Sequence, residues 1–264
     1  MPKTRSINDK VANLCKFFKV ADLRIMLQPD FLVNLRSSLS LNSDKNIINS
    51  RAWIQTAINI SKDIETKPYN AAKLKEYLPE LRGMTVKKPK EFLPRMHEIF
   101  AECGIAFVLL PHLKNSGVNG AVKWVTDDRV VLAINNRGVY ADKFWFSLFH
   151  EIRHVLQQKI KKVFISSTLE EMMDINNKLE IDADKFAKNY LISPEDYRRL
   201  APSRYISDDE IVEFAKTIGI HPGIVAGRLQ HEGIIPQERC SKLKEKYVFE
   251  IKKMNRQILG KDEI

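Results

Sequence analysis

Residues 144–157 read FWFSLFHEIRHVLQ, and this stretch decides how the rest of the chain is interpreted. His150 and His154 are four residues apart, so on a helix they lie one turn apart on the same face. Two imidazoles placed in this way can bind one zinc ion, and Glu151 lies beside them, where it can take a proton from water at the metal. The other face is apolar, with Phe144, Leu148, Ile152 and Val155 at helical spacing. The stretch therefore predicts a helix that is anchored in a core by one face and carries a metal site on the other.

A catalytic zinc site needs a third protein ligand and keeps its fourth position for water. The helix expected at 178–192, KLEIDADKFAKNYLI, offers Glu180, Asp182 and Asp184. Glu180 and Asp184 are four apart and share a face, whereas Asp182 points to the opposite side. An apolar stripe flanks Glu180, formed by Leu179, Ala183, Phe186, Ala187, Tyr190 and Leu191. We therefore assign Glu180 as the third ligand, Asp184 as the partner that holds a histidine N–H, and Asp182 as a solvated surface charge.

Two alternatives stay open at this point. A five-residue motif also occurs by chance, so the histidines can belong to a plain helix that hydrogen-bonds them in its core or exposes them. Glu170, Glu171 and Asp174 are expected in a loop and interpreted as solvated, although a ligand among them is not excluded.

The bulk composition narrows the class of protein. A chain of 264 residues can form one large domain or two small ones. No apolar run approaches the roughly 18 residues of a membrane span, and the opening MPKTRSINDK has no apolar signal core. Cys15, Cys103 and Cys240 are odd in number and widely spaced, which favours reduced thiols. We expect a cytoplasmic protein with no membrane partner, and the net charge of +10 permits non-specific attraction to nucleic acid as a secondary partner.

Hydrophobic periodicity predicts a mostly helical chain with one small sheet. Apolar residues recur at helical spacing over residues 7–82, including FLVNLRSSL, and RGMTVKKPK at 82–90 interrupts them. Further helices are expected at 91–102, 144–157 (capped by Asp142), 178–192, from Ser207 with Glu210 as a capping box to Gly219, and from Pro222 to Gly233. A buried strand is expected from residue 105, and GAVKWV with RVVLAI reads as a hairpin. The predicted fold class is α+β, with the small sheet beside the HExxH helix.

The motif residues resemble a known family. FWFSLFHEIRH followed by LEIDADKFAKNYLISPEDY is similar to the ImmA/IrrE family of bacterial zinc metallopeptidases. In that family a glutamate-containing helix with an A-x-x-F-A core and an L-[LM]-x-P end follows the zinc-binding helix. The matching positions here are Glu180, Ala183, Phe186, Ala187, Leu191, Ile192 and Pro194. IAFVLLPHL, NGAVKWV and GIHPGIVAGRLQHEGIIP are similar to the HigA-antitoxin-like branch, whose usual N-terminal helix-turn-helix domain we expect to be missing here.

The resemblance covers about residues 10–250, with specific motifs in the second half only. It implies a zincin-like, gluzincin-like metalloendopeptidase with Zn²⁺ as cofactor. Its substrate would be a specific protein, a helix-turn-helix repressor or an antitoxin of a toxin–antitoxin or stress-response system. With RGMTVKKPK as the candidate boundary, we expect three parts: an N-terminal helical region at 1–85, the peptidase core at 86–200 and a C-terminal helical subdomain at 201–264.

The implied mechanism assigns Glu151 as general base and then general acid. An oxyanion would need a donor besides zinc, and the candidates by residue type are Tyr140, His221, Arg228 and His231, each of which is more often structural. An extended substrate would pair with an edge strand, for which we nominate Gly120, Ala121, Val122, Lys123 and Trp124.

Two rival functions compete with the peptidase. Residues 209–235, DEIVEFAKTIGIHPGIVAGRLQHEGII, have a helix-turn-helix-like pattern that would suit a DNA-binding regulator. Arg228, Gln230 and His231 would be a thin reading surface, so a small helical subdomain is the stronger interpretation. The second rival is an antitoxin or toxin scaffold with a structural zinc, which would have no need for Glu151.

Overall fold

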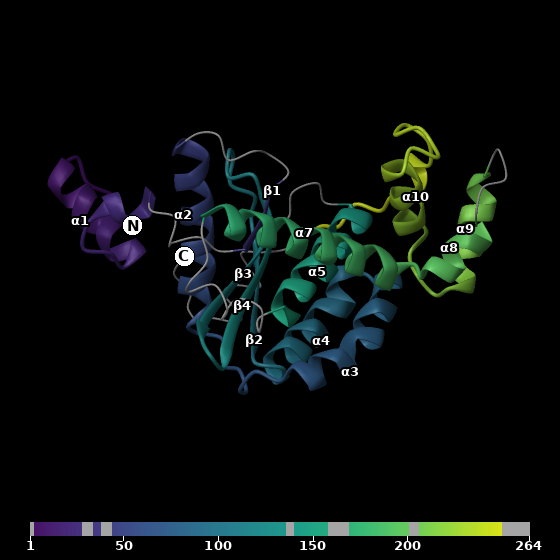
Figure 1. Ribbon diagram of the computed structural model, residues 1–264, viewed down its shortest axis with the longest axis horizontal. Helices are drawn as coiled ribbons and strands as arrows, with labels where there is room; N and C mark the ends of the chain where they lie inside the picture. Colours follow the sequence, from purple (N-terminus) through teal and green to yellow (C-terminus); the bar gives the residue numbers. More distant parts are fainter. Residues whose placement is uncertain are drawn as a thin grey trace.

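Helices dominate the computed structural model and enclose one small sheet (Figure 1), which confirms the α+β class. The structure describes residues 3–27, 34–37, 44–135, 140–157, 169–200 and 206–249. The α-helices are α1 (Ile7–Phe18), α2 (Asp44–Ser61), α3 (Ala71–Gly83), α4 (Pro89–Glu102), α5 (Ala141–Leu156), α7 (Leu169–Leu191), α8 (Pro194–Leu200), α9 (Asp208–Thr217) and α10 (Pro222–His231). Short 3-10 helices are η1 (Leu23–Leu27), η3 (Met84–Val86) and η5 (Ser241–Leu243). The strands are β1 (Asn34–Ser37), β2 (Ile105–Leu110), β3 (Val118–Thr126) and β4 (Arg129–Asn135).

The sheet has the order β1-β3-β4-β2 and separates two layers of helices (Figure 1). β3 pairs antiparallel with β1 and with β4, and β4 pairs parallel with β2. All of β2 is buried because its side chains alternate between two cores. Ile105, Phe107 and Leu109 join the core of α3, α4 and α5, and Ala106, Val108 and Leu110 join that of α2. A strand covered on both faces requires such a continuous apolar run.

α5 is held in the larger core near its first turn by the C-terminal segment. Trp145 is fully buried, and its Nε1 donates a hydrogen bond to the Tyr247 hydroxyl at 2.8 Å. The ring of Phe92 packs 5.0 Å from that of Trp145 and 5.6 Å from that of Tyr247. The backbone N–H of Ala141 donates to the Glu245 carbonyl at 2.9 Å. Residues 244–249 therefore fix the start of the helix that carries the HExxH motif.

Local signals placed several element ends correctly. Ser207 and Glu210 form the predicted capping box at α9, with Ser207 Oγ accepting from the Glu210 N–H and Glu210 Oε2 accepting from the Ser207 N–H. Gly104 follows α4 with a left-handed φ of 79°, and a Cβ there would lie 2.4 Å from backbone atoms of Tyr69. A glycine is thus needed where the chain turns from α4 into β2.

Three predicted elements differ from the structure. FLVNLRSSL is not helical at Asn34–Ser37, which form β1, because pairing with β3 outweighs a weak local preference. α7 begins at Leu169 rather than at residue 178, so Glu170, Glu171 and Asp174 lie in a helix and not in a loop, and their side chains lie outside the described residues. Asp142 is not the cap of α5. Tyr140 takes that position, and the Asp142 carboxylate pairs with Lys244 Nζ at 2.8 Å from within the first turn.

The division into parts at 1–85, 86–200 and 201–264 stays a prediction. Arg82 of the first part nevertheless donates to the Tyr190 and Ile218 carbonyls of the other two. None of the helices in the described part of the chain combines the length and the apolar composition that a bilayer crossing requires.

Candidate metal centre

α5 and α7 bring His150, His154 and Glu180 to one point. The Nε2 atoms of the two histidines are 2.9 Å apart. Glu180 Oε2 lies 3.2 Å from His150 Nε2, and Glu180 Oε1 lies 3.3 Å from His154 Nε2. The three residues that the sequence nominated as ligands are therefore neighbours, and their ligand atoms face one another.

The α5 helix is buried on more than its apolar face. Phe144, Leu148, Ile152 and Val155 lie in the core as predicted. His150 and His154 are each only 1% exposed, and Glu151 is 0% exposed. The side chain of Glu180 is 37% exposed, so solvent reaches the three nominated ligands mainly from the α7 side.

The outer nitrogen of each imidazole, Nδ1, faces an oxygen acceptor. His150 Nδ1 lies 2.8 Å from Asp184 Oδ1, as predicted, and a carboxylate can only accept there. His154 Nδ1 lies 2.9 Å from Gln157 Oε1. The Gln157 amide is oriented by its Nε2, which donates to the Leu179 carbonyl at 3.1 Å and to Asp182 Oδ2 at 2.6 Å. When a metal is bound, Nδ1 keeps the proton and Nε2 is the ligand atom, and the Nε2 atoms of both rings point to the same place.

This donor set fits a divalent metal ion. With both Nε2 atoms unprotonated, as metal binding requires, their lone pairs and the Glu180 carboxylate repel one another unless a cation lies between them. Ligands about 2.0–2.2 Å from zinc at tetrahedral angles lie about 3.3–3.6 Å apart, close to the 2.9–3.3 Å separations here. Two imidazoles and one carboxylate are also the protein ligands of an open catalytic zinc site.

The charge of Glu180 suits the same role. Burial acts to raise the pKa of its carboxyl, but hydrogen bonds with His150 and His154 outweigh burial and lower the pKa to about 2. Glu180 is therefore ionised at neutral pH, which is the form that binds a metal.

Asp182 does more than the solvated charge that we expected. It is half-exposed, but its Oδ2 accepts from Arg153 Nε and from Gln157 Nε2, each at 2.6 Å. Asp182 thereby orients the amide that holds His154. Gln157 and Arg153 were not among the residues predicted for the site, although Gln157 lies three residues after His154, about one helical turn further on, where a side chain can reach that ring.

The side chain of Glu151, which extends from α5, packs against β3 at Gly120. A Cβ built on Gly120 would lie 2.6 Å from Glu151 Cγ, 2.7 Å from Oε1 and 2.8 Å from Cδ. The carboxylate arm of the nominated base thus lies in the space that a side chain at Gly120 would need.

The nominated strand is not an edge strand over its first half. β1 pairs with β3 at Val118, Ala121 and Val122, so an added strand cannot use that side of β3 at Gly120, Ala121 or Val122. This pairing was not predicted, because the residues of β1 were expected to be helical. Among the described residues, the pairs between β1 and β3 end at Val122, and contact of Lys123 and Trp124 with a substrate stays a prediction.

The oxyanion candidates make other contacts. Tyr140 precedes His150 by almost three helical turns, about 15 Å along α5. His221 accepts from the Gly223 N–H at 3.0 Å, and Arg228 Nη1 donates to the Lys188 carbonyl, two turns beyond Glu180. His231 is exposed at the end of α10. These contacts lend no support to an oxyanion role, which stays a prediction for all four residues.

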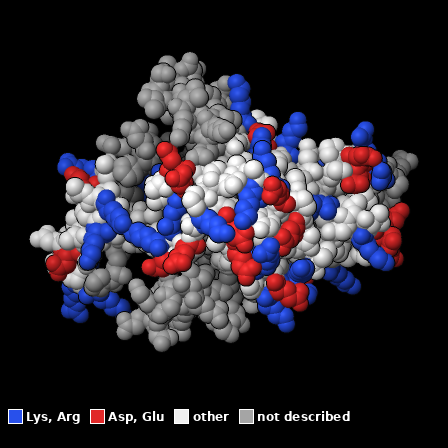
Figure 2. Space-filling view, turned by 90° about the horizontal axis from the view of Figure 1, so that it is seen from below, with Lys and Arg blue, Asp and Glu red and all other residues white. Residues whose placement is uncertain are grey.

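The predicted reading residues Arg228 and Gln230 of α10 already hydrogen-bond to other parts of the protein, so they are poorly placed to contact the bases of DNA. Arg228 is 11% exposed, with Nε donating to Glu232 at 2.6 Å and its guanidinium 4.2 Å from the centre of the Tyr197 ring. Gln230 is buried and donates to the Gln237 and Arg239 carbonyls. On the face shown in Figure 2, Lys and Arg are interspersed with Asp and Glu rather than gathered into a patch of one sign.

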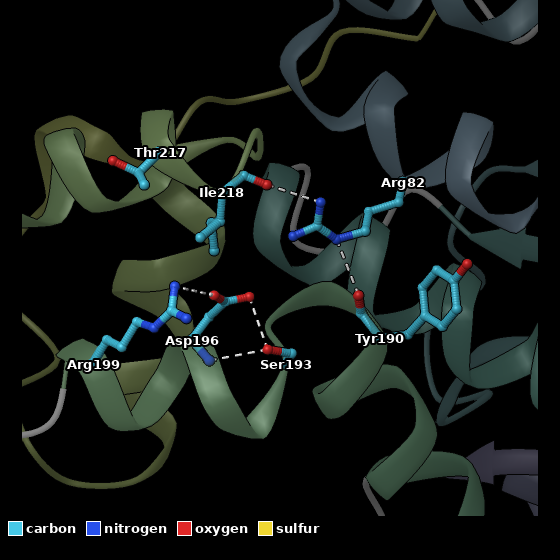
Figure 3. Close-up of a pocket in the computed structure, with 7 residues that line it drawn as sticks. All are labelled: Arg82, Tyr190, Ser193, Asp196, Arg199, Thr217 and Ile218. Carbon is cyan, nitrogen blue, oxygen red and sulfur yellow. Dashed lines mark hydrogen bonds and ion pairs between the residues drawn. The ribbon is translucent and has the colours of Figure 1, made fainter.

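A polar pocket of about 360 Å³ lies elsewhere, between α3, the end of α7, α8 and the end of α9 (Figure 3). Arg82 is one of the lining residues. It donates hydrogen bonds to the Tyr190 and Leu191 carbonyls at 3.1 Å and to the Ile218 carbonyl at 2.9 Å. Ser193 and Asp196 hydrogen-bond each other at 2.8 Å. Because Arg82 caps the carbonyl ends of two helices, the pocket is a structural joint.

Neither a scan of protein-family models nor a search of curated proteins found a match to this chain. The ImmA/IrrE resemblance therefore stays a prediction that rests on the motif residues.

Proposed function

We propose that this chain is a zinc-dependent metallopeptidase, similar to the ImmA/IrrE family, that hydrolyses a peptide bond in a specific protein partner. The observation that carries the proposal is the convergence of His150, His154 and Glu180, with Glu151 next to them on α5. A structural zinc site is usually closed by four protein ligands, whereas the three ligands found among the described residues would leave a position for water.

His150, His154 and Glu180 would hold the zinc, with Asp184 and Gln157 fixing the imidazole tautomers through Nδ1. When bound, zinc acidifies water and polarises a peptide carbonyl. Glu151 takes the proton from the attacking water and passes it to the leaving amine, so the same carboxylate acts as base and then as acid.

The substrate that we propose is a helix-turn-helix repressor or an antitoxin. The site chemistry supports only a peptide bond near an open zinc, and the narrower class comes from the family resemblance. Cleavage should be selective, because general proteolysis inside a cell would be toxic. One or two defined cuts are expected in the cognate regulator, with little activity on casein-like proteins.

The test separates ligand from base. Glu151→Gln should keep the fold and one zinc per chain but lower kcat about 10²–10⁴-fold, because an amide cannot accept the proton. Glu180→Gln should instead lose zinc, as should the His150→Ala, His154→Ala double variant. Zinc is measured by elemental analysis, and cuts in regulators encoded near this gene are mapped by mass spectrometry with and without chelator.

The reverse pattern, in which Glu151→Gln loses zinc and Glu180→Gln keeps it, would overturn the assigned roles. Unchanged zinc in the double-histidine variant would remove the metal site. Tight binding of a regulator with no cut under any metal would favour the scaffold with a structural zinc. The DNA-binding alternative has less support, since Arg228 and Gln230 are already held by protein groups.

A further inference from the structure

Gly120 is a glycine whose presence the backbone does not explain. Its φ lies outside the left-handed region, unlike that of Gly104, Gly117, Gly219 and Gly233. A glycine inside a strand weakens it, because the unfolded chain is freer and no side chain packs. Some other requirement must therefore keep position 120 without a side chain.

That requirement is space for Glu151. A Cβ on Gly120 would lie within 2.6–2.8 Å of three atoms in the outer half of the Glu151 side chain. Val122 and Trp124, further along β3 towards the same core, do carry packed side chains. On this face of β3, Gly120 therefore leaves a space beside Val122 and Trp124, and the side chain of Glu151 occupies that space.

The strand cannot recede to make room for a larger residue. Gly120 is in register with Ile134 of β4, and the next two residues, Ala121 and Val122, pair with Leu35 and Asn34 of β1. β3 is therefore held on both sides at this point. The end of the Glu151 side chain can rotate more easily than the paired backbone of β3 can shift. A methyl group at position 120 would therefore displace the carboxylate before it moved the sheet.

We infer that Gly120 is a positioning residue for the general base: its missing side chain lets Glu151 extend along the backbone of β3 to the place where proton transfer occurs. The inference rests on the proposed function for its catalytic meaning, but not for the contact itself. The three nearest atoms that a Cβ at Gly120 would meet all belong to Glu151, and none belongs to His150, His154 or Glu180.

The first readout is Gly120→Ala in the full chain loaded with zinc. Zinc affinity should stay within a few-fold of wild type, whereas kcat on a cleaved regulator should fall about 100-fold, the loss that a shift of about 1 Å can produce. Gly83→Ala is the matched control, because Gly83 has a φ of −62° and a Cβ there would meet nothing within 4 Å. Full turnover in a folded, zinc-bound Gly120→Ala would overturn the inference.

The second readout needs no substrate, so it distinguishes a failure of the inference from a failure of the proposed function. Gly120→Ala should lower the midpoint of thermal unfolding in the wild-type background. The same change should cause little or no loss in a Glu151→Ala background, because the three clashing atoms are gone. If Gly120→Ala alone does not fold and the double variant does, the inference is supported. An equal loss in both backgrounds, or failure of both to fold, would show that Glu151 is not what Gly120 accommodates.

Discussion

Replacing Gln157 by leucine should weaken zinc binding without removing any ligand. Leucine has a similar volume but no acceptor for His154 Nδ1, which now faces Gln157 Oε1 at 2.9 Å. His154 is 1% exposed, so water cannot take over that role. In the metal-free protein the ring can move its proton to Nε2, where Glu180 accepts it. With zinc on Nε2 the proton must stay on Nδ1, so the penalty falls on the zinc-bound state.

The size of the effect follows from that unsatisfied donor. A buried donor left without an acceptor costs about 1–3 kcal/mol. At 1.4 kcal/mol for each factor of ten, the zinc Kd should rise about 5–150-fold. Outer partners of metal-bound histidines typically contribute about 10–100-fold to affinity, which is the same range.

Competition with a chromophoric zinc chelator at pH 7.5 measures this Kd. Gln55→Leu is the control, because Gln55 also bonds a side chain, Asn59 at 3.1 Å, but lies on α2 across the sheet from α5. A folded Gln157→Leu variant with a zinc Kd within twofold of wild type would refute the tautomer argument. An equal weakening in Gln55→Leu would show that the effect is not specific to His154.

Two further predictions concern stability. Burial lowers the pKa of His97 to about 4 from 6.5, so the unfolded chain takes up the proton first as the pH falls. The stability from a neutral His97 is complete above about pH 6.5 and is lost towards pH 4, with about 2 kcal/mol gone at pH 5. Between pH 7.5 and 5.0, urea unfolding should show His97→Gln losing about 2 kcal/mol less than wild type, and equal losses would contradict the prediction. Arg82→Met should cost about 1.5–3 kcal/mol or more in urea unfolding, because its charged guanidinium holds three carbonyls. Arg199→Met, at an exposed position of the same pocket, should lower the free energy of unfolding by less than about 1 kcal/mol. Equal losses for the two variants would contradict the claim that Arg82 joins the two helix ends.

The residues of the candidate site were accessible from the sequence to different degrees. His150, Glu151 and His154 could be placed relative to one another because the helical period alone sets their spacing. Glu180 could be chosen over Asp182 by its face, although the helix begins earlier than expected. The Asp184 contact with His150 followed from the same spacing and is present at 2.8 Å.

Contacts between elements were not accessible in this way. Gln157 and Asp182 meet across 25 residues, and their bond depends on how α5 and α7 cross. β1 exists only through its pairing with β3, so its four residues carried no strand signal strong enough to find alone. The nominated edge strand failed over its first half for the same reason.

By itself the sequence determined the HExxH helix, the capping box at Ser207, the burial of β2 and the residue types that could hold a metal, because each depends on neighbours within a few residues along the chain. Only the tertiary structure decided that Gln157 holds His154, that Arg82 joins two helix ends and that Gly120 leaves room for Glu151. These depend on packing angles and strand register, which are set by the whole core and do not appear in the spacing of any one segment.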